Sequence, residues 1–151
     1  MPIRCEIVSQ DRMVWEGDAD IVNIPGMDGD MGILPNHAPL LTTLRFGIIN
    51  VRREGVDQFF TVSGGVVEVQ PQIVTILADA AENVEEIDIA RAEAAKVRAE
   101  EFMKEGPPPD SGVTLRMEAA LRRSTLRLEA VRRYRRSGQM RSEMPRQENE
   151  S

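Results

Sequence analysis

The sequence predicts a β + α protein, in which an N-terminal flattened β-sandwich or barrel is followed by an antiparallel hairpin of two helices. Apolar residues recur at period two in the first half of the 151-residue chain and at helical spacing in the second. The charge divides at the same place. Residues 1–86 hold five Arg and no Lys against 14 acidic residues, a net charge of −9, whereas residues 87–151 carry +3. We therefore expect a sandwich over 1–86, a hairpin over 87–137 and a disordered tail over 138–151.

The first part consists of short β-type runs separated by residues that reverse the chain. Ile3, Cys5 and Ile7 alternate with charged neighbours, which places them on the apolar face of a first strand. Further runs cover 21–24, 48–51, 59–62, 66–69 and 73–77, with turns expected at 9–12, 53–55, 64–65 and 71–72. Many short strands with frequent turns predict a sandwich or flattened barrel and not a sheet with crossover helices.

One long irregular stretch, from Gly26 to Pro39, is expected to interrupt the strands. A loop of this length in a compact domain is more often functional than idle. Asp28 and Asp30 do not complete a calcium loop, because the later ligand positions hold apolar residues and the bidentate Glu is missing. The glycines of this stretch and of Gly64-Gly65 are interpreted as tight turns, since no Lys-Ser/Thr pair follows them.

At Ile87 the apolar period becomes helical. Asp88 is placed as the N-cap of a first helix, which must end before Pro107–Pro109 because proline removes a donor and clashes with the preceding turn. A second helix is predicted from Asp110 or Ser111 to about Arg136. Its narrow apolar seam suits one partner helix and is formed by Met117, Leu121, Leu128 and Val131.

The chain is poor in the groups that catalysis requires. His37 is the only histidine and Cys5 the only cysteine, so a His-based triad, a multi-His metal site or an internal disulfide has no second member. No apolar run approaches the ~20 residues that cross a bilayer, and the N-terminus lacks the order of a secretory signal. We expect a soluble protein without catalytic residues or a metal site.

Arginines on the second helix are the strongest signal of anion binding. Arg116, Arg123 and Arg127 lie within a narrow arc, and nine Arg stand against two Glu between residues 116 and 141, a net charge of +7. Guanidinium groups suit phosphates and carboxylates alike. From spacing alone this face is either a solvated basic surface or a site for a nucleotide, an acidic protein, nucleic acid or membrane phosphate.

Three segments stand out in order along the chain. They are Gly29-Asp-Met-Gly-Ile-Leu-Pro-Asn-His-Ala-Pro-Leu-Leu-Thr42, Phe60-Thr-Val-Ser-Gly-Gly-Val-Val-Glu-Val69 with Val74-Thr-Ile-Leu-Ala78, and Ala81-Glu82 followed by Ile87-Asp-Ile-Ala-Arg-Ala92. Together these segments resemble the ATP synthase epsilon subunit family. The resemblance spans residues 1 to about 135. It implies a non-catalytic subunit of the rotor of the proton-translocating ATP synthase, which couples proton flow to ATP synthesis and inhibits ATP hydrolysis through its C-terminal helices.

The partners implied by this resemblance are the gamma subunit of the central stalk, the membrane c-ring and, through the C-terminal helices, the catalytic alpha and beta subunits. Nucleic acid is not among them, and contact with the membrane is expected only through the complex, at the cytoplasmic face of a bacterial cell membrane. Asp30 matches the acidic residue that faces the ring in the family. An exposed carboxylate there is suited to meet basic side chains of the ring loops.

In some members of the family the hairpin binds ATP through an Ile/Leu-Asp-x-x-Arg-Ala motif. Positions that match this site are Ile87, Asp88, Arg91 and Ala92 of the motif, Glu82 before it, and Arg123 and Arg127 on the second helix. No cofactor is required, and ATP would be a regulatory ligand. Pro107–Pro109 depart from the common pattern, because one continuous helix across them would cost ~3 kcal/mol or more for an interior proline.

Two other classes compete with this interpretation. The Arg-rich helix could serve a nucleic-acid-binding module in which the acidic sandwich dimerises; DNA binding with a steep salt dependence would favour it. A small acyl or phosphoryl enzyme is the other class, and it lacks a credible base near any nucleophile.

Overall fold

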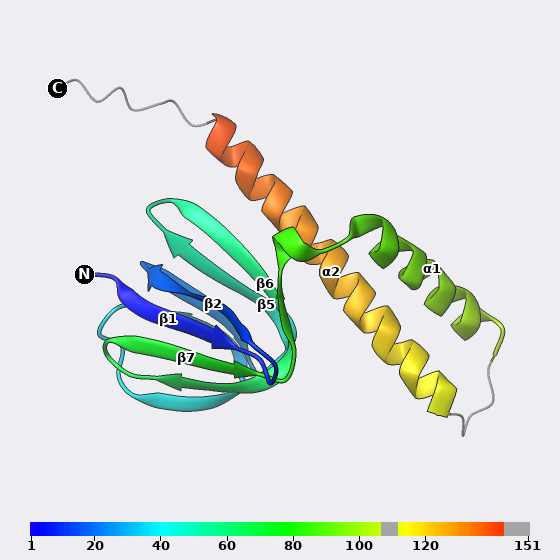
Figure 1. The fold of residues 1–151 in the computed structure, drawn as a ribbon, viewed down its shortest axis with the longest axis horizontal. Helices are drawn as coiled ribbons and strands as arrows, with labels where there is room; N and C mark the ends of the chain where they lie inside the picture. Colours follow the sequence, from blue (N-terminus) through cyan, green and yellow to red (C-terminus); the bar gives the residue numbers. More distant parts are fainter. Residues whose placement is uncertain (107–111, 144–151) are drawn as a thin grey trace.

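The structure, a computed structural model, describes residues 1–106 and 112–143 and consists of a strand-rich unit with two helices against one side (Figure 1). The strands are β1 (Ile3–Val8), β2 (Met13–Ala19), β3 (Ile21–Gly26), β4 (Gly29–Ile33), β5 (Leu40–Arg53), β6 (Val56–Val69), β7 (Ile73–Ala78) and β8 (Ala81–Asn83). A short 3-10 helix, η1 (Val84–Glu86), precedes α1 (Ile89–Lys104) and α2 (Gly112–Glu143). The predicted order of a β unit followed by two helices is confirmed.

The strands form one mixed sheet that folds over on itself without closing. Their order is β2-β1-β7-β6-β5-β3-β4, and β8 pairs with β6 beside this path. The β1–β7 pair is parallel, whereas the other pairs are antiparallel. Because β2 and β4 stand at opposite ends of the order, the unit is a sandwich and not a closed barrel.

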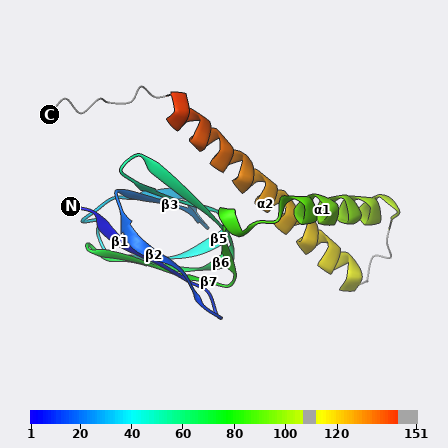
Figure 2. The same cartoon turned by 45° about the horizontal axis from the view of Figure 1, so that its top comes forward.

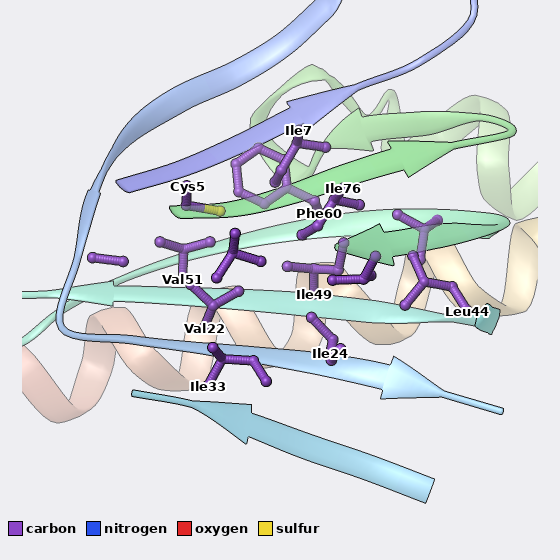
Figure 3. Close-up of a cluster of buried hydrophobic side chains, with 14 of the residues drawn as sticks. Cys5, Ile7, Val22, Ile24, Ile33, Leu44, Ile49, Val51, Phe60 and Ile76 are labelled. Atoms are coloured by element: carbon purple, nitrogen blue, oxygen red, sulfur yellow. The ribbon is translucent and has the colours of Figure 1, made fainter. Parts of the chain in front are cut away.

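A continuous apolar core fills the sandwich. Figure 3 shows side chains of β1 and β7, such as Ile7 and Ile76, facing those of β3 and β4, such as Ile24 and Ile33. Cys5 is fully buried in this core, as its alternation predicted, and burial raises the pKa of its thiol to about 12. The thiol therefore stays protonated and acts as a small apolar side chain.

The predicted turn at Gly64-Gly65 is wrong, because both residues lie inside β6. The register with β5 continues from Phe46↔Ser63 to Leu44↔Gly65 without a shift. Gly64 and Gly65 have φ of +101° and +137°, and a Cβ on Gly65 would stand 2.2 Å from the Leu77 carbonyl oxygen. The pair bends the strand where β6 exchanges its partner β8 for β7.

The prediction of an irregular stretch from Gly26 to Pro39 is also largely wrong. Residues 29–33 form β4, which pairs with β3 through a two-residue turn between Gly26 and Gly29. Met31 and Ile33 point inward and alternate with Asp30 and Gly32, a period-two pattern that the glycines obscured. Only residues 34–39 are irregular.

Both helices agree with the predicted hairpin, but α2 is longer than expected. Asp88 caps α1 as predicted, and Gly106, with φ of +68°, follows its C-terminal end. We expected α2 to end near Arg136, whereas it continues through Gly138 to Glu143. A single glycine costs a helix only ~1 kcal/mol, and the Gln, Met and Arg that follow favour helix. The start predicted at Asp110 or Ser111, and residues 144–151 of the predicted tail, lie outside the described residues.

The C-terminal half of α2 packs on the sandwich, while α1 packs on the N-terminal half of α2 and extends away from the sheet (Figure 2). Ala130 and Val131 of α2 are buried against Phe59 of β6 and Val84 of η1. Within the hairpin, Ala92 and Ala99 of α1 are buried. These contacts fix η1 and the start of α1 beside the middle of α2.

Candidate functional site

A cavity of about 300 Å³ lies where β8, η1, the start of α1 and the middle of α2 meet. We call it the hairpin cavity, and it is lined by Glu82, Glu86, Ile87, Asp88, Arg91, Ala92 and Arg127. Six of the seven residues that the resemblance singled out therefore share one cavity. The seventh, Arg123, lies next to it.

The short turn between β8 and α1 positions the cavity wall. Asn83 accepts a hydrogen bond from the Glu85 backbone N–H at 2.9 Å and caps η1, and Ile87 is extended. Asp88 then accepts from the Arg91 backbone N–H at 3.1 Å. Asp88 thus caps α1, as predicted from its position, and also lines the cavity.

The ion pair between Arg127 and Glu82 joins the hairpin to the sandwich across the cavity. Arg127 Nε and Nη2 both donate to the Glu82 carboxylate, the latter at 3.4 Å. Thr61 Oγ1 of β6 donates to the same carboxylate at 3.4 Å. Both charged side chains are partly buried, at 37% and 26% exposed, so this pair is screened less than a pair in full solvent.

Glu86 is a lining residue that sequence reasoning missed, together with its partner Arg12 in the β1–β2 turn. Arg12 donates to both oxygens of Glu86, with Nη2–Oε2 at 2.7 Å and Nη1–Oε1 at 3.3 Å. These hydrogen bonds lower the pKa of Glu86, outweighing its slight burial, and the charge of Arg12 adds to the shift. The two residues are 74 positions apart, and no spacing in the sequence links them.

Arg123 lines a smaller adjoining cavity of about 90 Å³. Glu82 and Arg127 line this cavity as well, so their ion pair stands between the two spaces. Arg116, which shares the arc of Arg123 and Arg127 in sequence, is exposed and lines neither space. The arginine arc is therefore divided along α2, with only Arg127 at the hairpin cavity.

Asp30 lies far along the chain from this cavity, on β4 next to the β3–β4 turn. Its side chain is 79% exposed and forms an ion pair with Arg45 of β5. The two residues also line a groove of about 420 Å³ between the sheet and α2, together with Glu129 and Arg133 of α2. The structure therefore presents the Asp30 carboxylate at the surface, where a partner can reach it.

Two further hydrogen bonds hold α2 to the sandwich beyond the cavity. Tyr134 donates to Glu85 at 3.2 Å, and Ser137 donates to Asp57 of β6 at 3.1 Å. Partial burial opposes ionisation of Asp57, but hydrogen bonds from Arg52, Asn50 and Ser137 outweigh it and lower the Asp57 pKa. All the carboxylates in these contacts belong to the acidic sandwich.

Within residues 1–106 and 112–143, no helix is long and apolar enough to cross a membrane. The same residues contain no group of three or more His, Cys, Asp or Glu that could hold a metal ion.

Comparison with known proteins assigns both parts of the chain to one complex. The family described as ATP synthase, Delta/Epsilon chain, beta-sandwich domain matches residues 2–84, and its long alpha-helix domain matches residues 85–132. An ATP synthase epsilon chain of Herpetosiphon aurantiacus is 45% identical over 132 residues, which is 87% of this chain and 96% of the relative. One from a Roseiflexus species is 55% identical over 95 residues, 63% of this chain and 68% of the relative.

Solved structures agree in fold. A chain in the Euglena gracilis mitochondrial ATP synthase assembly of OSCP, F1 and c-ring matches with a TM-score of 0.67 and 27% identity, over 80% of this chain and 76% of that one. A chain in the central stalk and c-ring of the Tetrahymena thermophila mitochondrial ATP synthase matches with a TM-score of 0.54 and 17% identity, over 87% and 97%. The sandwich and the helices that follow it, matched in order by both family domains, show that the chain belongs to the delta/epsilon chain family of ATP synthase.

Proposed function

We propose that this chain is the epsilon subunit of the central-stalk rotor of a proton-translocating ATP synthase and couples proton flow to ATP synthesis without catalysing a reaction itself. The match of both family domains, in order and over residues 2–132, carries this proposal. The catalytic sites would then belong to other subunits. The sequence holds a single histidine, His37, and a single cysteine, Cys5, which supports the non-catalytic role.

The proposed partners are the gamma subunit, the c-ring and the catalytic alpha and beta subunits. The Euglena assembly that contains a similar chain is an F1 and c-ring structure, which supports contacts with both sectors. Asp30 is proposed as a ring contact because its carboxylate is exposed and already pairs with a guanidinium, a group that basic ring loops can replace. Attachment would be peripheral, at the cytoplasmic face of a bacterial membrane.

We further propose that the hairpin cavity binds ATP as a regulatory ligand. Its volume of about 300 Å³ is at the lower end of ligand pockets, so it suits part of a nucleotide, with the remainder in solvent. Arg91 and Arg127 offer guanidinium groups to phosphates, while Ile87 and Ala92 offer apolar surface. Arg123 lines the adjoining cavity, so its guanidinium would have to turn toward the hairpin cavity to contribute.

We propose that the hairpin has a second, extended state in which its helices leave the sandwich. ATP would stabilise the folded state, because its contacts come from elements that separate in the extended one. Arg91 belongs to α1, Arg127 to α2 and Glu82 to β8. A ligand shifts a conformational equilibrium only by its difference in affinity for the two states, and the residues of this cavity would be separated in the extended one. Loss of ATP would free the basic helices to reach acidic surfaces of the catalytic subunits and inhibit hydrolysis.

A reconstitution experiment tests both parts of this function. The ATP synthase is assembled with the full chain, with a chain that ends at Glu86, and without the subunit, and ATP hydrolysis and proton-coupled ATP synthesis are measured with and without preincubation in ATP. We expect coupling to be lost only without the subunit, and the dependence on preincubation to be lost on truncation. Equal hydrolysis rates in the full and truncated assemblies would refute regulation, and unchanged coupling without the subunit would refute the rotor role.

A further inference from the structure

The charges that line the hairpin cavity do not suit a polyphosphate on their own. Three carboxylates, from Glu82, Glu86 and Asp88, stand against the guanidinium groups of Arg91 and Arg127. A polyphosphate carries several negative charges and would meet a wall with net negative charge. A ligand of this kind therefore needs a further cation close to the cavity.

Arg12 provides such a cation, from a part of the chain that the family motif does not include. Its guanidinium is held in a two-bond fork, at 2.7 and 3.3 Å, by Glu86, which lines the cavity, so this cation stands one side chain away from the lining. The hydrogen bonds and charge of Glu86 raise the pKa of Arg12, and the charge of Glu82 adds to this shift. Arg12 thus forms hydrogen bonds with one carboxylate of the wall, that of Glu86.

The turn that carries Arg12 holds its backbone in place while leaving its side chain accessible. The Arg12 carbonyl accepts from the Ser9 backbone N–H at 2.9 Å and from Ser9 Oγ at 3.3 Å. The side chain itself is 49% exposed. Because both partners of this ion pair are about half exposed and well solvated, the guanidinium can exchange the Glu86 carboxylate for a more highly charged phosphate.

We infer that Arg12 supplies a third guanidinium to the nucleotide site. When ATP binds, Arg12 breaks its pair with Glu86 and contacts the phosphates, and the ligand then connects the β1–β2 turn to the hairpin. This inference rests on the ATP binding proposed above. In the compact state the ligand then bridges α1, α2 and the N-terminal strand pair. Glu86 acts as an internal competitor that holds Arg12 when ATP is absent.

Titration of the purified full-length chain with ATP, by calorimetry, tests the inference. The variants are Arg12→Gln, Arg127→Gln as a marker of the cavity, and Arg4→Gln as the matched control. Arg4 forms a comparable exposed pair with Glu16 on the same two strands, at 3.1 Å and 42% exposed. We expect Arg12→Gln to weaken ATP binding about tenfold, as for loss of one charge-assisted pair, and Arg4→Gln to leave it unchanged.

A second comparison separates a direct contact from a general change in charge. Glu86→Gln should tighten ATP binding in the chain that has Arg12, and this gain should be much smaller in the Arg12→Gln background, because the two residues then act as a coupled pair. Thermal unfolding without ligand checks that the variants fold alike.

The outcomes distinguish the two proposals. If the unaltered chain does not bind ATP, the proposed nucleotide site is refuted, and the proposed role of Arg12 is refuted with it. If ATP binds and depends on Arg127, but Arg12→Gln binds as tightly as Arg4→Gln, the nucleotide site stands and only the role of Arg12 is refuted.

Discussion

Gly65 shows how strongly a single position can be constrained in this fold. The backbone of β6 approaches β7 so closely there that an added Cβ would stand 2.2 Å from the Leu77 carbonyl oxygen and 2.8 Å from the Ala78 Cα. Its φ of +137° is also one that other residues rarely adopt. Steric contact and backbone conformation therefore both require glycine at this bend.

Replacing Gly65 by Ala should lower the free energy of unfolding by more than its backbone conformation alone explains. Gly29 is a matched control, since its φ is +134° and a Cβ there meets nothing within 4 Å. We expect Gly29→Ala to cost ~1–3 kcal/mol from backbone strain. Gly65→Ala should cost at least ~2 kcal/mol more, because β6 and β7 must move apart. Urea unfolding of both variants measures the difference, and equal losses would show that the close approach is not a constraint.

Sequence patterns at the residue scale predicted some roles and misjudged others for a clear reason. The capping role of Asp88 was predicted correctly because a cap depends on a few adjacent residues. The turn predicted at Gly64-Gly65 is wrong, because glycine indicates a special φ but not whether the chain reverses or bends within a strand. The distinction depends on β7, which lies elsewhere in the sequence.

In α2, the pattern of apolar residues along the sequence does not identify every buried position. Its apolar seam was predicted from Met117, Leu121, Leu128 and Val131, yet the most buried side chain near the middle of the seam is Ser124, at 1% exposed. Ser124 Oγ donates to the Ala120 carbonyl of the preceding turn at 2.8 Å, so its hydroxyl is satisfied inside the helix. Hydrophobicity alone cannot place a polar residue at such a position.

Gly138 lies inside α2, which continues to Glu143. A Cβ on Gly138 meets nothing within 4 Å, so Gly138→Ala should add helix propensity without a clash. We expect the free energy of unfolding to rise by up to ~1 kcal/mol, with a larger helical circular dichroism signal at 222 nm. Gly106→Ala is the opposing control, because Gly106 ends α1 with φ of +68° and should lose about as much. No gain from Gly138→Ala would indicate that α2 ends before this residue.

At the scale of the whole molecule, the acidic sandwich and the basic helix are held together by contacts that sequence reasoning could not pair. Arg127 was predicted as an anion-binding residue, and in the structure its anion is Glu82 of the sandwich. Similarly, Arg12 and Glu86 come together only because β1 lies beside β7, which leads into β8 and η1. The charge division indicated where the two parts meet along the chain, whereas their pairing and the cavity between them follow from the topology.

A small apolar contact docks α2 on the sandwich. Ala130 is fully buried against Phe59 and Val84, so Ala130→Glu would place a carboxylate in an apolar contact, at a cost of several kcal/mol. We expect the hairpin to detach while the sandwich stays folded, since its core is separate from this contact. Trypsin should then cleave α2 faster, with little change in the fluorescence of Trp15, whose ring lies 5.8 Å from that of Phe60 in the sandwich.

Thr125→Glu is the control for this prediction, because it adds the same charge to an exposed position of α2. It should leave both trypsin cleavage and fluorescence close to those of the unaltered chain. Should Ala130→Glu shift the Trp15 emission together with the rate of cleavage, the sandwich and hairpin would unfold as one unit, and α2 could not act as a separately released arm. Faster cleavage with unchanged emission would instead show that this small contact decides whether the basic helix is held or free.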